Sequence, residues 1–212
     1  MMSDNTETLV RNIGRPSGST GEITAPRILR VAMQVFGRRG YEATSMKEIA
    51  KAANLTVGSI YHYYPSKADL FIAAAGELYA ICQRGFSRFL NQHAAFPERL
   101  SVLLQAGKEF FKEEEDLQRF AMGLPTELRH HHELRQALAP QYNQFAELYR
   151  RVATEAQNRG ELPANTSPTI VAIILEVLFS TAFPQMARAA GEDFEQIVVQ
   201  LDAVLQKGLC NK

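Results

Sequence analysis

The sequence has few of the features that mark secreted, membrane-spanning or β-rich proteins. Its 212 residues include only two cysteines, Cys82 and Cys210, which are too few and too far apart to indicate a disulfide framework. The first residues, MMSDNTETLVRNIG, contain no continuous apolar core, so a signal peptide is not expected. The most apolar run covers residues 170–183 and contains Glu176, whereas a helix that crosses a bilayer needs about 20 apolar residues. Strand-like alternation is absent. We therefore expect a soluble, cytoplasmic, all-α protein with no membrane partner.

Motifs for catalysis and metal binding are also lacking. The chain has no Gly-x-Ser-x-Gly elbow, no P-loop and no Gly-rich dinucleotide turn. Three consecutive histidines, His130, His131 and His132, lie between Glu127 and Glu133 and suggest a metal site. Consecutive helical positions point in three directions, so the three rings cannot all bind one ion, and we interpret them as surface residues. The sequence predicts no enzyme, no cofactor and no metal site.

The segment from Tyr41 to Phe71 carries the most specific pattern. Thr44 or Ser45 can cap a short helix whose inward face is apolar, and Asn54 tolerates the left-handed backbone that ends such a helix. Thr56 can then cap a second short helix. Pro65 stops that helix. Two helices of about eight residues joined by a tight turn indicate a helix-turn-helix, whose second helix enters the major groove of DNA.

The outer residues of this unit match a known family. The segments RILRVAMQVFGRRGYEATSMKEIAKAANLT, VGSIYHYYPSK and ADLF resemble the tetracycline-repressor-like (TetR) family of transcriptional regulators over about residues 25–75. Val57 departs from the polar or basic residue that is frequent in the family, so it is expected to contact a thymine methyl group rather than guanine. The resemblance implies phosphate contacts from Tyr61, Tyr63 and Lys67. The expected DNA-binding residues are Arg15, Thr44, Ser45, Thr56, Val57, Gly58, Ser59, Tyr61, His62, Tyr63 and Lys67.

A zero net charge conceals a basic amino-terminal third. Residues 11–67 contain nine Lys or Arg and three Glu, whereas residues 68–212 contain 14 basic and 18 acidic residues. This asymmetry is typical of a phosphate-binding module joined to a domain that does not bind DNA. Residues 1–24 form an expected flexible basic arm, in which Arg15 suits an A·T-rich minor groove; an ordinary disordered terminus is the alternative.

Prolines, glycines and capping residues along the rest of the sequence predict about nine helices in two domains. The first helix is expected from Pro26 to Arg39, and residues 25–71 form the helix-turn-helix domain. Residues 72–212 form an effector-binding and dimerisation domain, connected through a helix that starts at Ser66. We expect a short helix that stops near Gly123 and Pro125, and a later one that opens at Pro140.

Two carboxy-terminal segments indicate a dimer. The last helix repeats apolar residues at helical spacing, and together with residues 170–183 it presents a broad apolar face. Burying this face against a second copy gives a four-helix interface, an arrangement that the family resemblance also implies; the alternative is that both helices face only their own core. The expected interface residues are Ile174, Leu178, Phe194, Ile197, Val198, Leu201, Val204 and Leu205.

Aromatic and Met residues between the fifth and eighth helices are candidates for an effector pocket, although most of them also suit an ordinary core. An apolar cavity with few polar anchors favours a lipophilic or aromatic ligand. The candidate residues are Phe110, Phe111, Phe120, Met122, Tyr142, Phe145, Tyr149, Glu176, Phe179 and Phe183.

These features predict a ligand-responsive regulator, expected to be a repressor. It would bind palindromic double-stranded operator DNA as a homodimer, and a small apolar or aromatic effector would release it. The alternative is a constitutive DNA-binding dimer whose carboxy-terminal domain only dimerises. Addition of an effector distinguishes the two, because only the regulator then releases DNA.

Overall fold

The computed structural model describes residues 20–90, 94–113 and 115–210, and every regular element in these ranges is a helix. The helices are, in chain order, α1 (Thr20–Arg39), α2 (Met46–Ala52), α3 (Val57–Tyr63), α4 (Lys67–Leu90), α5 (Phe96–Glu113), α6 (Glu115–His130), α7 (His132–Asn158), α8 (Pro168–Val177), η1 (Leu178–Ala182), α9 (Phe183–Ala190), η2 (Gly191–Asp193) and α10 (Phe194–Leu209). Because α8 and α9 are continuous through the π turn η1, these ranges contain nine helical rods, and the all-α prediction is confirmed.

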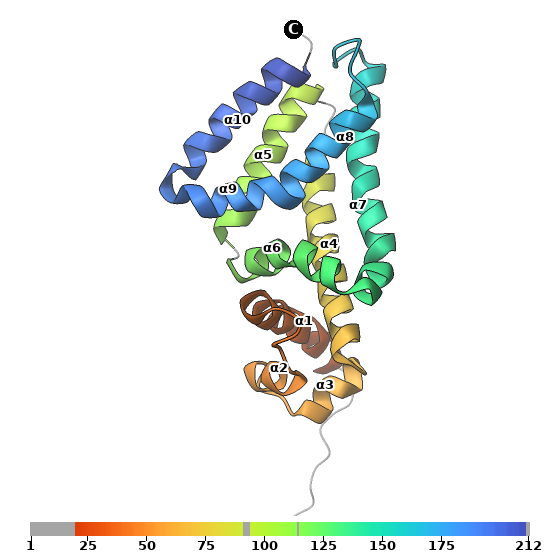
Figure 1. Cartoon of the computed structure of the whole chain (residues 1–212), viewed down its shortest axis with the longest axis vertical. Helices are drawn as coiled ribbons and strands as arrows, with labels where there is room; N and C mark the ends of the chain where they lie inside the picture. Colours follow the sequence, from red (N-terminus) through yellow and green to blue (C-terminus); the bar gives the residue numbers. More distant parts are fainter. Residues whose placement is uncertain (1–19, 91–93, 114, 211–212) are drawn as a thin grey trace, which may run out of the picture.

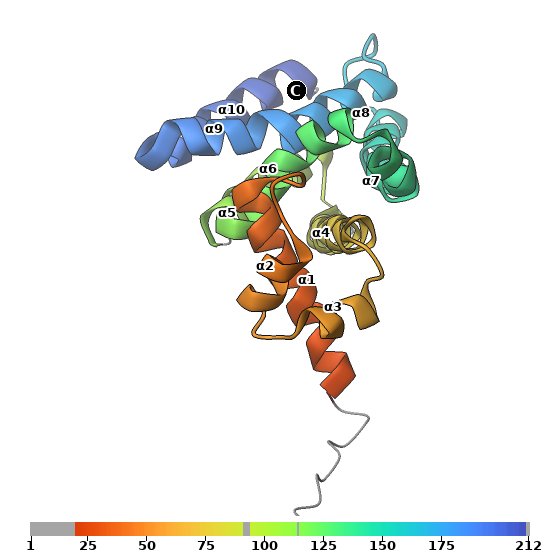
Figure 2. The same cartoon turned by 60° about the horizontal axis from the view of Figure 1, so that its bottom comes forward.

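The first three helices form one end of an elongated molecule (Figure 1). Helix α6 lies across that end, while α4 and α7 run side by side along the length and α8 packs on α7. Figure 2 shows α8, α9 and α10 in a layer at the opposite end from α3. The α4 helix passes from one end to the other, so it physically joins the two halves.

The core beneath the helix-turn-helix includes residues from distant parts of the chain. Phe36, Tyr41 and Phe71 contact one another, and Phe120 of α6 packs edge-on against Phe71 with ring centroids 5.4 Å apart. Leu134 of α7 is fully buried in the same cluster. The amino-terminal helices therefore share their hydrophobic core with α6 and α7, so a movement of these two helices bears directly on the DNA-binding end.

Proline positions account for three differences between the expected and observed helices. The first helix begins at Thr20 rather than Pro26, the expected stop near Pro125 lies inside α6, and Pro140 lies inside α7. A proline removes one backbone donor but does not end a helix whose other turns are packed. Leu124, directly before Pro125, and Leu138, two residues before Pro140, are buried, which explains why both helices continue.

The apolar helix near the carboxyl end is longer and more exposed than expected. Residues Pro168–Ala190 form one helical stretch that is long and apolar enough to cross a membrane by length and composition, and 39% of its most apolar window is buried. The expectation that this apolar segment is too short to cross a bilayer is therefore corrected, because the helical stretch has 23 residues. A core helix or an interface helix has the same composition, so length alone does not separate these cases from a membrane span.

Candidate functional site

Local hydrogen bonds fix the two short helices of the helix-turn-helix. The Ser45 hydroxyl accepts from the Glu48 backbone N–H at 3.3 Å, and Glu48 accepts in return from the Ser45 N–H at 2.9 Å, which is a reciprocal capping box. The hydrogen bonds that the Glu48 carboxylate accepts from the Ser45 N–H and hydroxyl lower the pKa of Glu48. Asn54 has a φ of +51°, as the turn requires. The Thr56 hydroxyl accepts from the Ser59 N–H at 3.0 Å and caps α3. The sequence prediction of this motif is confirmed.

Helix α3 has a buried anchor and an open outer face. Ile60 is fully buried, whereas 48% of the Tyr61 surface is exposed, and Gly58 and His62 are also exposed. A Cβ added at Gly58 would meet only the Thr56 hydroxyl, at 3.9 Å. Packing therefore does not require glycine here, although glycine weakens a helix by about 1 kcal/mol relative to alanine. A missing side chain on this face instead leaves room for the close approach of another molecule.

Two of the expected DNA contacts have structural roles in this protein. Thr44 does not cap α2, because its side chain is buried and donates to the Gly40 carbonyl oxygen at 2.7 Å, so the expectation of a DNA contact from this side chain is corrected. Lys67 donates through Nζ to the carbonyl oxygens of Tyr41 and Glu42, at 2.8 and 3.3 Å, and lies 4.3 Å from the centre of the Tyr41 ring. One of its three N–H groups is left for a phosphate.

The other residues expected to contact DNA are exposed, half-buried or outside the described residues. Ser45, Thr56, Val57, Ser59 and Tyr63 are exposed or half-buried around α2 and α3, so their DNA contacts stay predictions. Arg15 and most of the arm lie outside the described residues. The structure adds Lys47 and Lys51, which are exposed on α2 and which sequence reasoning did not select; their spacing of four residues on a basic helix was the available signal.

The DNA-binding end contacts α6 through three residues, Gly37, Arg38 and Tyr41. Gly37 lies against the α6 backbone, where a Cβ would come within 2.8 Å of the Phe120 nitrogen. The next residue, Arg38, donates to both carboxylate oxygens of Asp116 at 2.9 Å. Beyond the end of α1, the backbone N–H of Tyr41 donates to Glu127 at 3.0 Å. Together these contacts couple α6 to the helix-turn-helix.

His131 adds a fourth contact that the sequence did not reveal. It is only partly exposed, and its ring packs edge-on against Tyr41 with centroids 4.8 Å apart. Its Nε2 lies 3.3 Å from Glu42, and its Nδ1 lies 3.4 Å from Glu133. The interpretation of three surface histidines is therefore corrected for the middle one, since only His130 and His132 are exposed. A single histidine within a polar run has no periodicity that would signal burial.

The expected effector residues whose side chains the structure describes lie in separate parts of the fold. Tyr149 stacks on Phe179 with centroids 6.3 Å apart, and both are buried with Phe183 in the core between α5, α7, α8 and α9. Burial raises the pKa of Tyr149 well above its usual value. Phe120 belongs to the core beneath the DNA-binding helices, so its assignment to an effector pocket is corrected.

The other candidates lie elsewhere. Met122 is half-buried, and the side chains of Phe111 and Phe145 lie outside the described residues. The Tyr142 hydroxyl donates to Glu176, and this hydrogen bond raises the pKa of Tyr142 to about 12. Phe110 and Tyr142 border two separate cavities, of about 270 and 410 Å³ respectively. Effector binding by each of these residues stays a prediction.

The expected dimer residues fall into two groups. On α10, Phe194 and Val198 are buried in the core of their own chain, and Leu201 and Leu205 pack against it, so the last helix turns this stripe inward. Its polar side is held to α5, where the Ser101 hydroxyl donates to Asp202 at 2.7 Å. Leu178 is also buried, Ile197 is half-buried, and Ile174 and Val204 are exposed. Burial leaves Phe194 and Val198 no surface for a partner, whereas a dimer contact from the half-buried Leu201 and Leu205 stays a prediction.

A second apolar face lies on α8 and points away from the core. Ile170, Ile173, Ile174 and Val177 follow the i, i+3, i+4, i+7 spacing of one helix face, and all four are exposed. Sequence periodicity did not distinguish this face from the buried one, because almost every residue of α8 is apolar.

Comparison with known proteins places these observations in a family. A model of the DNA-binding region, described as "Bacterial regulatory proteins, tetR family", matches residues 28–74, which include α2, α3 and their capping residues. AcrR of Shigella flexneri, an HTH-type transcriptional regulator, is 36% identical over 93 residues, which are 43% of this chain and 41% of AcrR. The repressor KstR of Mycobacterium tuberculosis is 42% identical over 50 residues, which are 24% of this chain and 23% of KstR. The chain thus spans less than half the length of these relatives.

Solved structures share the fold over most of the chain. A transcriptional regulator from Saccharomonospora viridis in complex with choline has a TM-score of 0.73 and 17% identity, covering 90% of this chain and 100% of the other. AibR in complex with isovaleryl coenzyme A and operator DNA has a TM-score of 0.64 and 21% identity, covering 85% of this chain and 97% of the other. At these identities the likeness shows the fold. The match over residues 28–74 identifies the helix-turn-helix as that of the TetR family of transcriptional regulators.

Proposed function

We propose that this protein is a ligand-responsive transcriptional repressor that binds palindromic operator DNA as a homodimer. The observation that carries the proposal is the shared core, in which α6 and α7 complete the hydrophobic cluster beneath an outward-facing α3. A helix-turn-helix built in this way reads DNA on one side and depends on the effector domain on the other. The repressor relative KstR and the operator complex of AibR support the assignment.

Within this proposal, α3 supplies the groups that face the bases. Val57, Gly58, Ser59 and His62 are assigned to base edges, and Tyr61 and Tyr63 to phosphates, because they lie on or beside the exposed side of α3. Helix α2 and the cap of α3 contribute further phosphate contacts through Ser45 and Thr56. The third N–H of Lys67 is assigned to a phosphate.

The effector acts through α6 as well as through α4. Helix α4 spans both ends of the molecule, but α6 makes the direct contacts with α1 through Gly37, Arg38 and Tyr41. A small molecule that moves α6 therefore moves the helix-turn-helix without acting through α4. The choline and isovaleryl coenzyme A complexes support a small-molecule effector for a protein of this fold. We infer that the effector of this chain has an apolar part, because both cavities have mainly apolar walls.

The exposed face of α8 supplies the dimer contact. Four large aliphatic side chains on one helix face gain free energy when a second copy covers them. A two-fold axis through this face brings two recognition helices to one side of the DNA. Contact with a second copy, rather than with lipid, also accounts for the apolar composition of Pro168–Ala190. A protein that acts on operator DNA works in the cytoplasm, so we assign it there.

Two measurements test this function. Selection from random duplex DNA with the full-length protein is expected to enrich an inverted repeat, and a metabolite library is expected to contain a compound that raises the melting temperature and weakens binding to that repeat. Enrichment of an inverted repeat with no compound that weakens binding would favour the constitutive dimer instead. Failure to enrich any sequence would contradict a DNA-binding function.

A further inference from the structure

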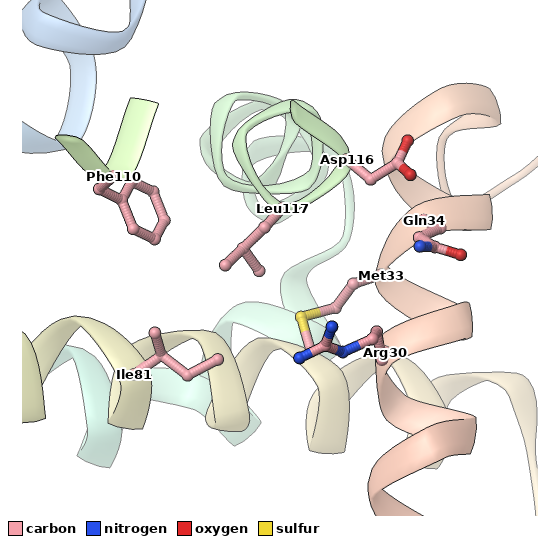
Figure 3. Close-up of a pocket in the computed structure, with 7 residues that line it drawn as sticks. All are labelled: Arg30, Met33, Gln34, Ile81, Phe110, Asp116 and Leu117. Atoms are coloured by element: carbon pink, nitrogen blue, oxygen red, sulfur yellow. The ribbon is translucent and has the colours of Figure 1, made fainter. Parts of the chain in front are cut away.

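A cavity of about 270 Å³ lies between the DNA-binding end and the effector domain (Figure 3). We call it the α1–α6 cavity. Its apolar side chains come from four helices, with Met33 on α1, Ile81 on α4, Phe110 on α5 and Leu117 on α6. Figure 3 shows these side chains directed toward one common space. The cavity therefore touches both halves of the molecule at once, unlike the second cavity, which is lined by α6 and α7.

The polar end of the α1–α6 cavity has an excess of positive charge. Arg30, Gln34 and Asp116 line this end. The Asp116 carboxylate is neutralised by Arg38, whose guanidinium donates to both of its oxygens at 2.9 Å. Arg30 has no ion-pair partner among the described residues, and Figure 3 shows its guanidinium turned beneath Met33 toward the cavity. A guanidinium is the side chain best suited to hold a carboxylate, because it offers paired N–H donors.

The size of the cavity sets the length of the occupant. A water molecule takes about 30 Å³ of liquid volume, so a space of 270 Å³ accommodates roughly nine non-hydrogen atoms. This lies just below the usual range for drug-sized ligands, which begins at about 300 Å³. An aliphatic carboxylate with a chain of roughly eight carbons fits the volume, the apolar wall and the single cationic end.

The cavity lies at a position along α1 where an occupant can change the angle between α1 and α6. Arg30, Met33, Gln34 and Gly37 follow the i, i+3, i+4, i+7 spacing of one helix face. At Gly37 this face meets the α6 backbone with no room for a Cβ, whereas one to two turns earlier it borders the cavity. Helix α1 is thus in tight contact with α6 at one point and separated from it at the next. An occupant of the gap acts on the angle between the two helices.

We propose that the α1–α6 cavity binds a medium-chain aliphatic carboxylate, with its carboxylate on Arg30 and its tail between Met33, Ile81, Phe110 and Leu117. The proposal rests on the proposed repressor function in one respect only: the ligand weakens operator binding by changing the angle of α1. Binding of the carboxylate to the protein does not depend on that function and is tested separately.

The first experiment titrates the full-length protein with sodium octanoate and, as an uncharged probe of similar length, with octan-1-ol. The wild-type protein is expected to bind octanoate at least tenfold more tightly than octanol. Arg30→Gln is expected to weaken octanoate binding at least tenfold and to leave octanol binding within twofold. The matched control is Arg129→Gln, which removes an arginine from the rim of the second cavity and is expected to change neither affinity.

Filling the cavity provides a second, independent variant. Leu117→Trp places a larger side chain in the space and is expected to abolish binding of both probes, and Ile81→Phe serves the same purpose from α4 if the first variant does not melt cooperatively. Octanoate affinity in Arg30→Gln within twofold of wild type would overturn the proposal. So would a loss of octanoate binding in Arg129→Gln, or no binding of octanoate at a concentration of about 1 mM.

The second experiment measures operator binding with a duplex selected from random DNA. Octanoate is expected to weaken operator binding by about 5- to 150-fold in wild type and by less than twofold in Arg30→Gln. If no operator is selected, the repressor function fails while the octanoate titration still decides the site. Equal octanoate affinity of free and operator-bound protein would overturn the role of this cavity in controlling DNA binding.

Discussion

At the scale of single residues, Gly58 is a position where a substitution is expected to affect folding stability and DNA binding in opposite directions. Apart from its chain neighbours and the backbone of its own helix, nothing lies closer than 3.9 Å to a Cβ at this position, so Gly58→Ala is expected to leave the fold intact and to stabilise it by up to about 1 kcal/mol. The added methyl group occupies space on the face assigned to base edges, so operator affinity is expected to fall by tenfold or more. Denaturant unfolding and a DNA titration measure the two effects.

The control for this variant is Gly85→Ala, on α4, where a Cβ meets nothing within 4 Å. It is expected to raise stability by a similar amount without changing operator affinity. Unchanged DNA binding in Gly58→Ala would remove this glycine from the interface.

Lys67 illustrates a residue with two roles. Lys67→Ala removes the donor to the Tyr41 and Glu42 carbonyl oxygens, and we expect a loss of about 1–3 kcal/mol in the free energy of unfolding. If the third N–H binds a phosphate, the slope of log affinity against log salt also becomes shallower by about one unit. Lys47→Ala, at an exposed lysine, controls for loss of charge without the carbonyl contacts. Wild-type stability in Lys67→Ala would show that the carbonyl contacts contribute nothing to folding.

At the scale of helices, the contact at Gly37 is the place to test coupling. A Cβ there would lie 2.8 Å from the Phe120 nitrogen and 3.1 Å from the Asp116 carbonyl oxygen, and both of these are backbone atoms that cannot rotate away. Overpacking costs about 1–3 kcal/mol, and the better helix propensity of alanine offsets about 1 kcal/mol of it. Gly37→Ala is therefore expected to lose up to about 2 kcal/mol of stability and to displace α1 from α6.

Displacement of α1 is expected to weaken operator binding and to reduce any further weakening by effector. Gly123→Ala on α6 is the matched control, because a Cβ there meets nothing within 4 Å. The two variants are compared by melting temperature and by DNA titration with and without effector. A Gly37→Ala protein with the operator affinity and effector response of wild type would show that this contact transmits no signal.

The helices also show what a sequence reveals and what it does not. Ser45, Asn54, Thr56 and Ile60 act through their immediate neighbours, so spacing and capping chemistry predicted the helix-turn-helix correctly. Pro125 was misjudged because its effect depends on tertiary packing. Helix α6 continues through it since residues such as Phe120 are held in a core built mainly from distant helices.

The sites that depend on three-dimensional packing were harder to predict. An amphipathic stripe such as the one on α10 shows that a helix has a buried side, but not whether its own chain or a partner covers it. Aromatic residues show the same ambiguity between core and pocket, and Phe120 and Tyr149 were resolved only by their contacts. The α1–α6 cavity combines side chains from four helices, and no local pattern links them: Arg30, Met33, Gln34, Ile81, Phe110, Asp116 and Leu117.

At the scale of the whole molecule, the dimer prediction now concerns α8 rather than the inward stripe of α10. Ile173 is 53% exposed, so Ile173→Glu is expected to leave the folded chain intact but to disfavour association, since a carboxylate buried between two copies would lack a partner. Leu201→Glu instead affects the core of its own chain and is expected to lower the melting temperature at all protein concentrations.

Sedimentation and thermal unfolding distinguish these outcomes. The control is Gln200→Glu, which adds a carboxylate at an exposed position of α10 and is expected to change neither property. A dimer of Ile173→Glu as stable as that of wild type would place the two-fold contact somewhere other than this face of α8.

The arrangement of two recognition helices in one dimer leads to a prediction about the DNA. Half-sites read by a two-fold dimer lie about 34–36 Å apart, which is one helical turn of about 10 base pairs, so both are read from the same side of the duplex. Insertion of about half a turn between them moves the second half-site to the opposite side. Affinity for this duplex is therefore expected to fall to that of a single half-site, as measured by DNA titration. The monomeric Ile173→Glu variant supplies the control, because a single recognition helix is indifferent to spacing. If wild type bound the original and the inserted duplex equally well, the two helix-turn-helix units would not act together, and each chain would bind DNA alone.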